Sequence, residues 1–404
     1  MQRRILILTD ELAPPAYAPR VVSLCRYLSE NDWLCTICSD RMPGVPAFHT
    51  EYAEVKQMQY YTSPSNRLRY IADKMFNQRE RQFQRFVEDR VAVADFDIIF
   101  CSTCYYFPLV TTLRLAEKFH KPFVVDLRDI AEQWGNVGFM THSLPNLFGL
   151  DKTIKNLYNK YNIRKRNTII SKANAVVTIS PWHQKLLGKY NSRTHLIYNG
   201  FDPADFYPLD LPTEQFIISY AGRIYNTKFR DPRLVMQALG ELIRERKLNN
   251  DIVLRFRVDN TSVDTLRQLA EQYNISNICD ISTYIPKSEL LHFMHKSSIC
   301  LVLTCKSTPE GAHGIMGTKF FEALGVEKPV LCIRSDEECL EQVIIQTNAG
   351  LAARNVEDTK TFILDKYDEW KQFHFTRQKV NQYAGLFSRQ MQSQQFEHLF
   401  LSLL

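Results

Sequence analysis

The first half of the chain alternates short apolar runs with segments in which apolar residues recur at helical spacing. The apolar runs predict strands at 4–9, 34–38, 96–101, 122–127 and 175–179, and the helical spacing predicts helices near 21–28 and 113–119. Strand and helix units that alternate in this way are typical of a parallel sheet with helices on both faces.

A turn-forming, proline-rich stretch at 199–212 interrupts this pattern and marks a domain boundary. The alternation then restarts, with strands predicted at 216–223, 252–258, 299–305 and 329–334 and helices near 234–242, 263–273 and 287–295. Near the end, Phe396, Leu399, Phe400 and Leu403 form one helical stripe that should pack against a core. We therefore expect an α/β protein with two doubly wound, Rossmann-like domains, 1–205 and 206–385, and a terminal helix, 386–404, that packs back toward the first domain.

The composition agrees with a globular protein of this kind. The 404 residues are 45% hydrophobic and 23% charged, and they are too many for one compact core. No apolar run approaches the roughly 18 residues of a spanning helix, and the first residues indicate a strand and a loop, not a secretion signal. We expect a cytoplasmic protein.

Two Cys-x-x-Cys pairs, Cys35/Cys38 and Cys101/Cys104, raise the question of a zinc site. Both pairs lie in or at the end of predicted strands, where a spacing of three residues directs the side chains to opposite faces. We therefore expect buried thiols and no metal.

The segment from Gly311 to Pro329, GAHGIMGTKFFEALGVEKP, is the most informative. Its glycines lead to Thr318, which can cap a helix whose exposed N–H groups and dipole favour an anion. Lys319 and Glu322 share one face of this helix, and Gly325 suits a left-handed helix end. Taken alone, the segment is either a diphosphate site or a tight turn before an ordinary helix.

Several ordered segments carry a family resemblance. VVDLRDIAEQW, ANAVVTIS, LIYNGFDPADFYP, YAGRIYNTK and TKFFEALGVEKPVL resemble, in this order, landmarks of the retaining GT-B-fold glycosyltransferases of family four. The resemblance implies that the first domain binds an acceptor and the second a nucleotide sugar. It also implies transfer of the sugar to a hydroxyl group of a saccharide or lipid-linked saccharide, in surface polysaccharide or glycolipid assembly.

The resemblance implies a donor site in the second domain, with the diphosphate held by Arg223 and Lys228 and the ribose hydroxyls by Glu322. Arg230 competes for the role of the lysine, and Lys319 could reach a phosphate or only neutralise Glu322. The expected donor residues are Gly222, Arg223, Lys228, Gly314, Gly317, Thr318, Lys319 and Glu322.

The sequence departs from the family at one place. The family often has a second glutamate eight residues before the position of Glu322, and this chain has Gly314 there. The group that would hold the sugar hydroxyls is therefore unassigned, with the amides of 314–317, His313 or Glu310 as substitutes.

The acceptor-side candidates of the first domain are Arg20, Asp126, Arg128 and Asp129. The last three lie at or just beyond a predicted strand end. Asp129 is the candidate base for the acceptor hydroxyl, although it could only order its loop, and the departing phosphate could take the proton instead. Asp126 is interpreted as a structural anchor paired with Arg128. No Asp-x-Asp signature is present near the expected site, so we expect no metal and no cofactor other than the nucleotide-sugar substrate.

Charge along the chain suggests a further partner. Residues 152–172 hold seven Lys or Arg and no acid, with Ile154, Leu157, Tyr158 and Tyr161 on one face, and 67–90 is also basic. Such helices can lie on an anionic membrane surface or can pack on a core with solvated outer faces. The net charge of +6 is modest, and we expect no nucleic-acid binding. A GT-B-fold sugar-nucleotide epimerase and a catalytically silent partner subunit remain alternative functions.

Overall fold

The computed structural model describes residues 2–10, 12, 19–41, 44–60, 73, 76–104, 106–134, 150–224 and 229–404. The chain divides into two compact units. Unit 1 comprises 1–198 and 389–404, and unit 2 comprises 199–388. The boundary thus lies seven residues before the predicted one at 205/206, and the final helix belongs to unit 1.

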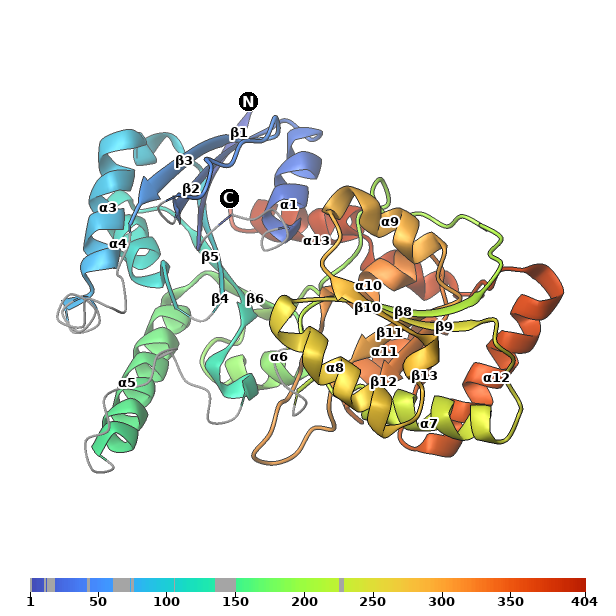
Figure 1. The fold of residues 1–404 in the computed structure, drawn as a ribbon. Coiled ribbons are helices and arrows are strands. Elements are labelled where there is room, and N and C mark those ends of the chain that lie inside the picture. The colour runs from blue at the N-terminus through green and yellow to red at the C-terminus, as the bar shows by residue number, and fades with distance from the viewer. Residues whose placement is uncertain are drawn as a thin grey trace. The chain divides into compact units, whose positions relative to one another are not determined.

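Unit 1 is a seven-stranded sheet whose strands all run parallel, in the order β3-β2-β1-β4-β5-β6-β7 (Figure 1). The strands are β1 Arg3–Thr9, β2 Trp33–Arg41, β3 Glu54–Gln59, β4 Ile98–Cys104, β5 Phe123–Asp129, β6 Ala175–Thr178 and β7 Thr194–Leu196. The helices are α1 Pro19–Ser29, α3 Gln78–Arg90, α4 Leu109–Phe119, α5 Leu150–Lys172, α6 Pro181–Leu187 and α13 Arg389–Leu401.

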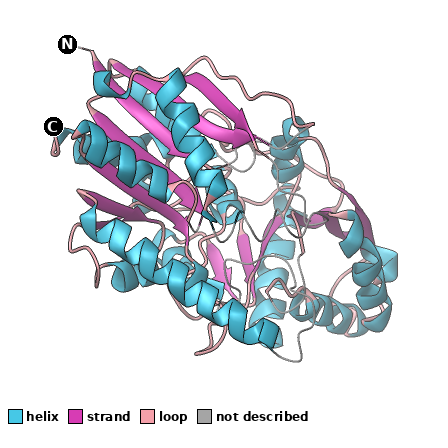
Figure 2. Cartoon of the chain, turned by 90° about the vertical axis from the view of Figure 1, so that its left-hand side faces the viewer, coloured by secondary structure: helices cyan, strands magenta, loops and turns pink. Residues whose placement is uncertain are grey.

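Helices cover both faces of this sheet (Figure 2). Residues of α3, α4, α5 and α6 share one buried cluster with the strands, and residues of α1 and α13 share the other. Cys35 lies in the second cluster and Cys38 in the first, so these two thiols point to opposite faces, as their spacing in a strand predicts.

Unit 2 repeats the same design with six parallel strands in the order β10-β9-β8-β11-β12-β13. The strands are β8 Phe216–Ala221, β9 Ile252–Val258, β10 Cys279–Thr283, β11 Ile299–Leu303, β12 Val330–Ile333 and β13 Gly350–Ala352. The helices are α7 Arg233–Arg244, α8 Asn260–Gln272, α9 Lys287–His295, α10 Thr318–Gly325, α11 Cys339–Thr347 and α12 Val356–Phe373. The predicted fold class, two doubly wound parallel sheets, is confirmed.

Candidate functional site

The turn that follows β8 is packed against the side chain of Lys319. Gly222 has a φ of +156°, and a Cβ atom at this position would lie 2.2 Å from Lys319 Cε. Only glycine therefore permits the lysine chain to cross the backbone here. This contact brings the Gly-Arg segment and the Thr-Lys-x-x-Glu helix, which are far apart in sequence, to one place at the carboxyl end of β8.

Arg223, the next residue, has an exposed side chain, and its main-chain carbonyl accepts two hydrogen bonds. Tyr220 Oη donates to Arg223 O at 3.0 Å, and Arg230 Nη1 donates to the same oxygen at 2.5 Å. Arg230 thus holds the turn that presents Arg223. Lys228, the predicted second cation, lies outside the described residues.

The N-terminus of α10 is left uncapped by side chains. The prediction that Thr318 caps the helix is wrong: Gly317 is the N-cap residue, and it has no side chain that could accept from the first turn. Phe320 N donates to Gly317 O at 3.3 Å, but among the described residues no acceptor faces the N–H groups of Thr318 and Lys319, which remain donors for an anion at this end. A Cβ atom on Gly317 would meet nothing within 4 Å, so this backbone borders open space.

Lys319 and Glu322 are both half-buried in α10, and within the part of the chain that the structure describes no ion pair joins them. The alternative in which Lys319 only neutralises Glu322 is therefore not observed. Phe320, Ala323 and Leu324 are buried as predicted.

The prediction of a left-handed Gly325 is also wrong. Gly325 is the last helical residue, and the left-handed residue is Glu327, with a φ of +53°. A Cβ atom on Gly325 would lie 2.6 Å from Phe201 Cδ2. The glycine therefore permits close packing against Phe201 and does not serve as a helix cap.

The first part of the glycine loop is bound by Glu338, a residue that the sequence analysis did not identify. Gly314, with a φ of +61°, donates its N–H to Glu338 Oε2 at 3.0 Å. His313 Nδ1 lies 3.2 Å from Glu338 Oε1, and Ser307 Oγ donates to Oε2 at 3.0 Å. The amide of Gly314, one of the suggested sugar donors, is thus already engaged, and Glu310 is exposed.

In unit 1, Arg20 and Asp126 form a buried ion pair. Arg20 Nε and Nη2 each lie 3.0 Å from an oxygen of Asp126, and both side chains are almost fully buried. Arg20 also donates to the carbonyls of Ile197 and Tyr198, and Ser102 Oγ donates to Asp126 at 2.8 Å. Asp126 is a structural anchor, but its partner is Arg20 and not Arg128 as expected.

Arg128 instead forms an ion pair with Asp10 at the carboxyl ends of β5 and β1. Asp129 lies beside this pair, with one oxygen 2.6 Å from Gln133 Nε2 and the other 3.6 Å from Cys104 Sγ. Burial raises the pKa of the Asp129 carboxyl above its usual range, and the hydrogen bond from Gln133 opposes the shift. A carboxyl group with a raised pKa is better suited to accept a proton near neutral pH.

The basic helix α5 has two different parts. Near its start, Ile154, Leu157 and Tyr161 are 43%, 62% and 57% exposed, whereas Ile169 and Ile170 near its end are buried. Arg166, one of the seven basic residues of 152–172, is fully buried, and it forms a bidentate pair with Glu132 at 2.7 Å. It cannot contact a membrane. The other basic stretch, 67–90, is only partly described.

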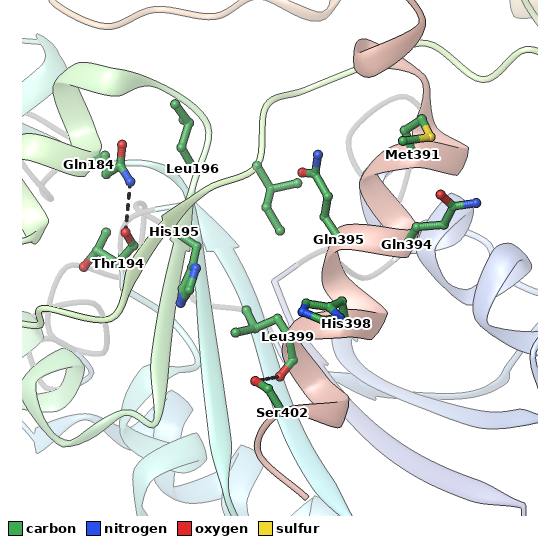
Figure 3. Close-up of a pocket in the computed structure, with 11 residues that line it drawn as sticks. Gln184, Thr194, His195, Leu196, Met391, Gln394, Gln395, His398, Leu399 and Ser402 are labelled. Atoms are coloured by element: carbon green, nitrogen blue, oxygen red, sulfur yellow. Dashed lines mark hydrogen bonds between the residues drawn. The ribbon is translucent and has the colours of Figure 1, made fainter.

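Unit 1 also contains a hollow of about 690 Å³ between the edge strand β7 and α13 (Figure 3). His195, Gln394, Gln395 and His398 line it, and none of its lining residues is Asp, Glu, Lys or Arg. Burial lowers the pKa of His195, so its imidazole is neutral at pH 7. None of the predicted acceptor residues lines this hollow.

Two family models match the chain in succession. Residues 19–205 match Glycosyltransferase Family 4, and residues 202–374 match Glycosyl transferases group 1. The chain belongs to the glycosyltransferases of this two-domain type. No curated protein matches its sequence.

Solved structures of the GT-B fold are similar over nearly the whole length. Sucrose-phosphate synthase from Thermosynechococcus elongatus has a TM-score of 0.66 at 14% identity and covers 99% of both chains. HepE from Anabaena, solved with UDP-glucose, has a TM-score of 0.62 at 14% identity and covers 99% of this chain and 100% of its own. MnaA from S. aureus, solved with UDP, has a TM-score of 0.52 at 13% identity and covers 100% of this chain and 98% of its own.

Among the described residues, no group of three or more His, Cys, Asp or Glu side chains is arranged to hold a metal ion. No helix in the described ranges combines the length and the apolar character needed to cross a bilayer.

Proposed function

We propose that this glycosyltransferase moves a sugar from a nucleoside diphosphate sugar to a hydroxyl group of a saccharide or lipid-linked acceptor, with retention of the anomeric configuration. The contact between Lys319 and Gly222 carries the proposal, because it joins the Gly-Arg turn to the uncapped N-terminus of α10. Cationic side chains and helix N–H groups at one place are the groups that stabilise a departing diphosphate.

Within this site, Arg223 and Lys228 bind the diphosphate and Glu322 accepts hydrogen bonds from the ribose hydroxyls. An arginine fork donates two hydrogen bonds to a phosphate, and a lysine adds a compact positive charge. These cations serve the leaving group without a divalent metal, so EDTA should leave turnover unchanged. Because HepE was solved with UDP-glucose and MnaA with UDP, uridine nucleotides are the first ligands to test.

On the acceptor side, we propose Asp129 as the base that receives the proton of the acceptor hydroxyl. Its raised pKa and its position at the carboxyl end of β5 support this role. If the departing phosphate takes the proton instead, Asp129 only orders its loop through Gln133.

We propose that α5 places the enzyme on the cytoplasmic face of an anionic membrane, where lipid-linked acceptors are found. Ile154, Leu157 and Tyr161 are exposed beside the exposed cations Lys160 and Arg164. Apolar and cationic side chains together are what an interfacial helix needs.

A sugar-nucleotide epimerase is the second candidate, because a Listeria monocytogenes protein described as a UDP-N-acetylglucosamine 2-epimerase is similar in structure to this chain, with a TM-score of 0.57 at 12% identity. An epimerase changes the sugar while the nucleotide stays attached. A catalytically silent partner subunit would bind no nucleotide.

The deciding experiment is a thermal-shift screen of the full chain against UDP, GDP and ADP sugars, since a ligand that binds only the folded state raises the melting temperature. The nucleotide sugar that gives the largest shift is then incubated with a hydroxyl acceptor, and NMR assigns the anomeric configuration of the product. A glycoside with the configuration of the donor is expected. An inverted linkage contradicts retention, and an altered sugar on an intact nucleotide identifies an epimerase.

A further inference from the structure

We propose that Glu338 determines sugar specificity in the donor site: its carboxylate accepts a hydrogen bond from a hydroxyl group of the transferred sugar. The proposal rests on the proposed function and assigns a residue to a part of the site that the glycine loop leaves empty. Between Gly311 and Gly317 the loop contains no acidic residue, and Gly314 has no side chain at all.

Glu338 lies beside this loop although it is distant in sequence. Its carboxylate contacts Gly314 N at 3.0 Å and His313 Nδ1 at 3.2 Å, so it borders the first part of the loop that leads into α10. Ser307, which follows β11, donates at 3.0 Å to Oε2, the oxygen that also accepts from Gly314. The group is therefore held in one position before any ligand binds.

The carboxylate is available because another residue caps α11. Glu338 occupies the N-cap position, where a side chain ordinarily accepts from the first turn. Here Asp336 does so, accepting from Leu340 N at 2.9 Å and from Glu341 N at 3.0 Å. Glu338 makes no cap hydrogen bond and is directed toward the glycine loop instead.

Counting donors from the described residues alone, one acceptor position of this carboxylate is unoccupied. An ionised carboxylate offers about four lone-pair positions. Oε2 uses its two for Ser307 and Gly314, whereas Oε1 uses one for His313, and the side chain is 26% exposed. Oε1 can thus accept one more hydrogen bond from the solvent side.

The charges at the two ends of the glycine loop determine which part of the nucleotide sugar lies beside Glu338. Lys319 and the positive end of the α10 dipole lie at the end of the loop, and these groups favour the diphosphate. A carboxylate at the start of the loop repels phosphate but accepts hydrogen bonds from neutral hydroxyls. The two ends of the loop therefore bind different parts of a nucleotide sugar, with the sugar at Glu338.

Glu338→Gln separates this role from a purely structural one. Glutamine keeps an oxygen that accepts from Ser307 and Gly314, and its NH₂ group takes the place of Oε1, where it can donate to His313 Nδ1 in the other tautomer but can accept nothing from a sugar. The matched control is Glu337→Gln, which removes the charge of the neighbouring residue and its pair with Lys306 at 2.9 Å without touching the glycine loop.

Calorimetry measures the dissociation constants of two ligands: the nucleotide sugar that most stabilises the wild type in the screen, and its own nucleoside diphosphate. We expect Glu338→Gln to raise the dissociation constant of the nucleotide sugar about tenfold to a hundredfold, because one charged hydrogen bond is lost. The dissociation constant of the nucleoside diphosphate should stay within about twofold of the wild-type value. Glu337→Gln should change neither, and Glu338→Ala, which also releases the loop, should weaken both.

Equal weakening of both ligands in Glu338→Gln overturns the proposal in favour of a structural latch, and unchanged binding of both overturns it outright. If the wild type binds no nucleotide sugar, the test of the proposed function has already failed before the variants are compared. That result rejects the proposed function, and with it the role of Glu338.

Discussion

The candidate site residues of unit 1 and those of unit 2 are held in opposite ways. In unit 1, Arg20 pairs with Asp126 and Arg128 pairs with Asp10. In unit 2, Arg223 is exposed, and Lys319 and Glu322 share a helix face without pairing. A buried charge depends on its partner, because an unpaired charge inside a protein is costly, whereas charged groups that do not pair with one another suit a charged ligand.

Arg20→Ala tests the structural side of this comparison and should have the largest effect. Removing the arginine leaves Asp126 buried and uncompensated, which should cost about 3–5 kcal/mol of unfolding free energy, measured by urea denaturation. Arg4→Ala is the control, because its pair with Asp95 is exposed and should contribute no more than about 1 kcal/mol. A loss as small as that of the control would show that Arg20 is not structural.

Arg223→Ala tests the ligand side. We expect a loss of on the order of a hundredfold in kcat/KM, or about 2.7 kcal/mol, with the melting temperature unchanged, and the same for Lys228→Ala. Arg267→Ala serves as control, because its pair with Asp264 is exposed on α8. Turnover like that of the wild type in Arg223→Ala and Lys228→Ala would remove both residues from the site.

Glu322→Ala should weaken the binding of the free nucleoside diphosphate by about 1.5–3 kcal/mol, the value of a charged hydrogen bond, with a smaller effect on stability. Calorimetry measures the dissociation constant, and Glu271→Ala, an exposed glutamate of α8, is the control. An unchanged constant in Glu322→Ala would contradict its contact with the ribose.

The pH profile of kcat/KM tests Asp129. Its carboxyl is buried, like the paired residues of unit 1, but is proposed to act on a substrate, like the residues of unit 2. A base acts in its ionised form, so kcat/KM should fall about tenfold per pH unit below the pKa of Asp129, which burial has raised above the usual aspartate range. Gln133→Ala removes a hydrogen bond that favours ionisation and should move this acid limb to higher pH. If the pH profiles of Gln133→Ala and Asp129→Asn both match that of the wild type, the departing phosphate and not Asp129 takes the proton.

The exposed cations of α5 should give the smallest effect. Lys160→Gln with Arg164→Gln should weaken binding to anionic vesicles by about 1 kcal/mol for each charge, measured by sedimentation, and rising salt should have the same effect. Transfer to a short, water-soluble acceptor should continue. Lys172→Gln is the control, because this lysine pairs with Glu117 at the other end of the helix. Sedimentation of the double variant like that of the wild type would place any membrane contact elsewhere.

The sequence predicted most of the central strands and missed short or peripheral ones. Strands β1, β4, β5, β8 and β11 are continuous apolar runs because helices bury both of their faces. The outer strands β3, β7, β10 and β13 are polar or only three residues long, so their composition does not distinguish them from loops.

Single residues were harder to assign where a distant partner decides their role. Arg166 resembles its solvated neighbours on α5 until Glu132 is placed against it, and Gly325 resembles a helix cap until Phe201 packs on it. Glu338 gave no signal, because its contact with Gly314 arises only from the tertiary fold. The Gly-Arg and Thr-Lys-x-x-Glu motifs could be recognised in the sequence because each lies within a single loop and helix, and their role in donor binding stays a prediction.

The position of α13 affects how the protein is made. Phe396 and Phe400 pack on Phe100 with ring centroids 5.4 Å apart, and Phe400 also meets Trp33 at 6.0 Å. On the ribosome, the first 198 residues of unit 1 are translated first, yet the part of the sheet face that α13 covers beside α1 stays uncovered until the whole of unit 2 has followed. During that interval Phe100 and Trp33 are exposed to water and to other nascent chains, which makes the newly made first half a natural client for chaperones.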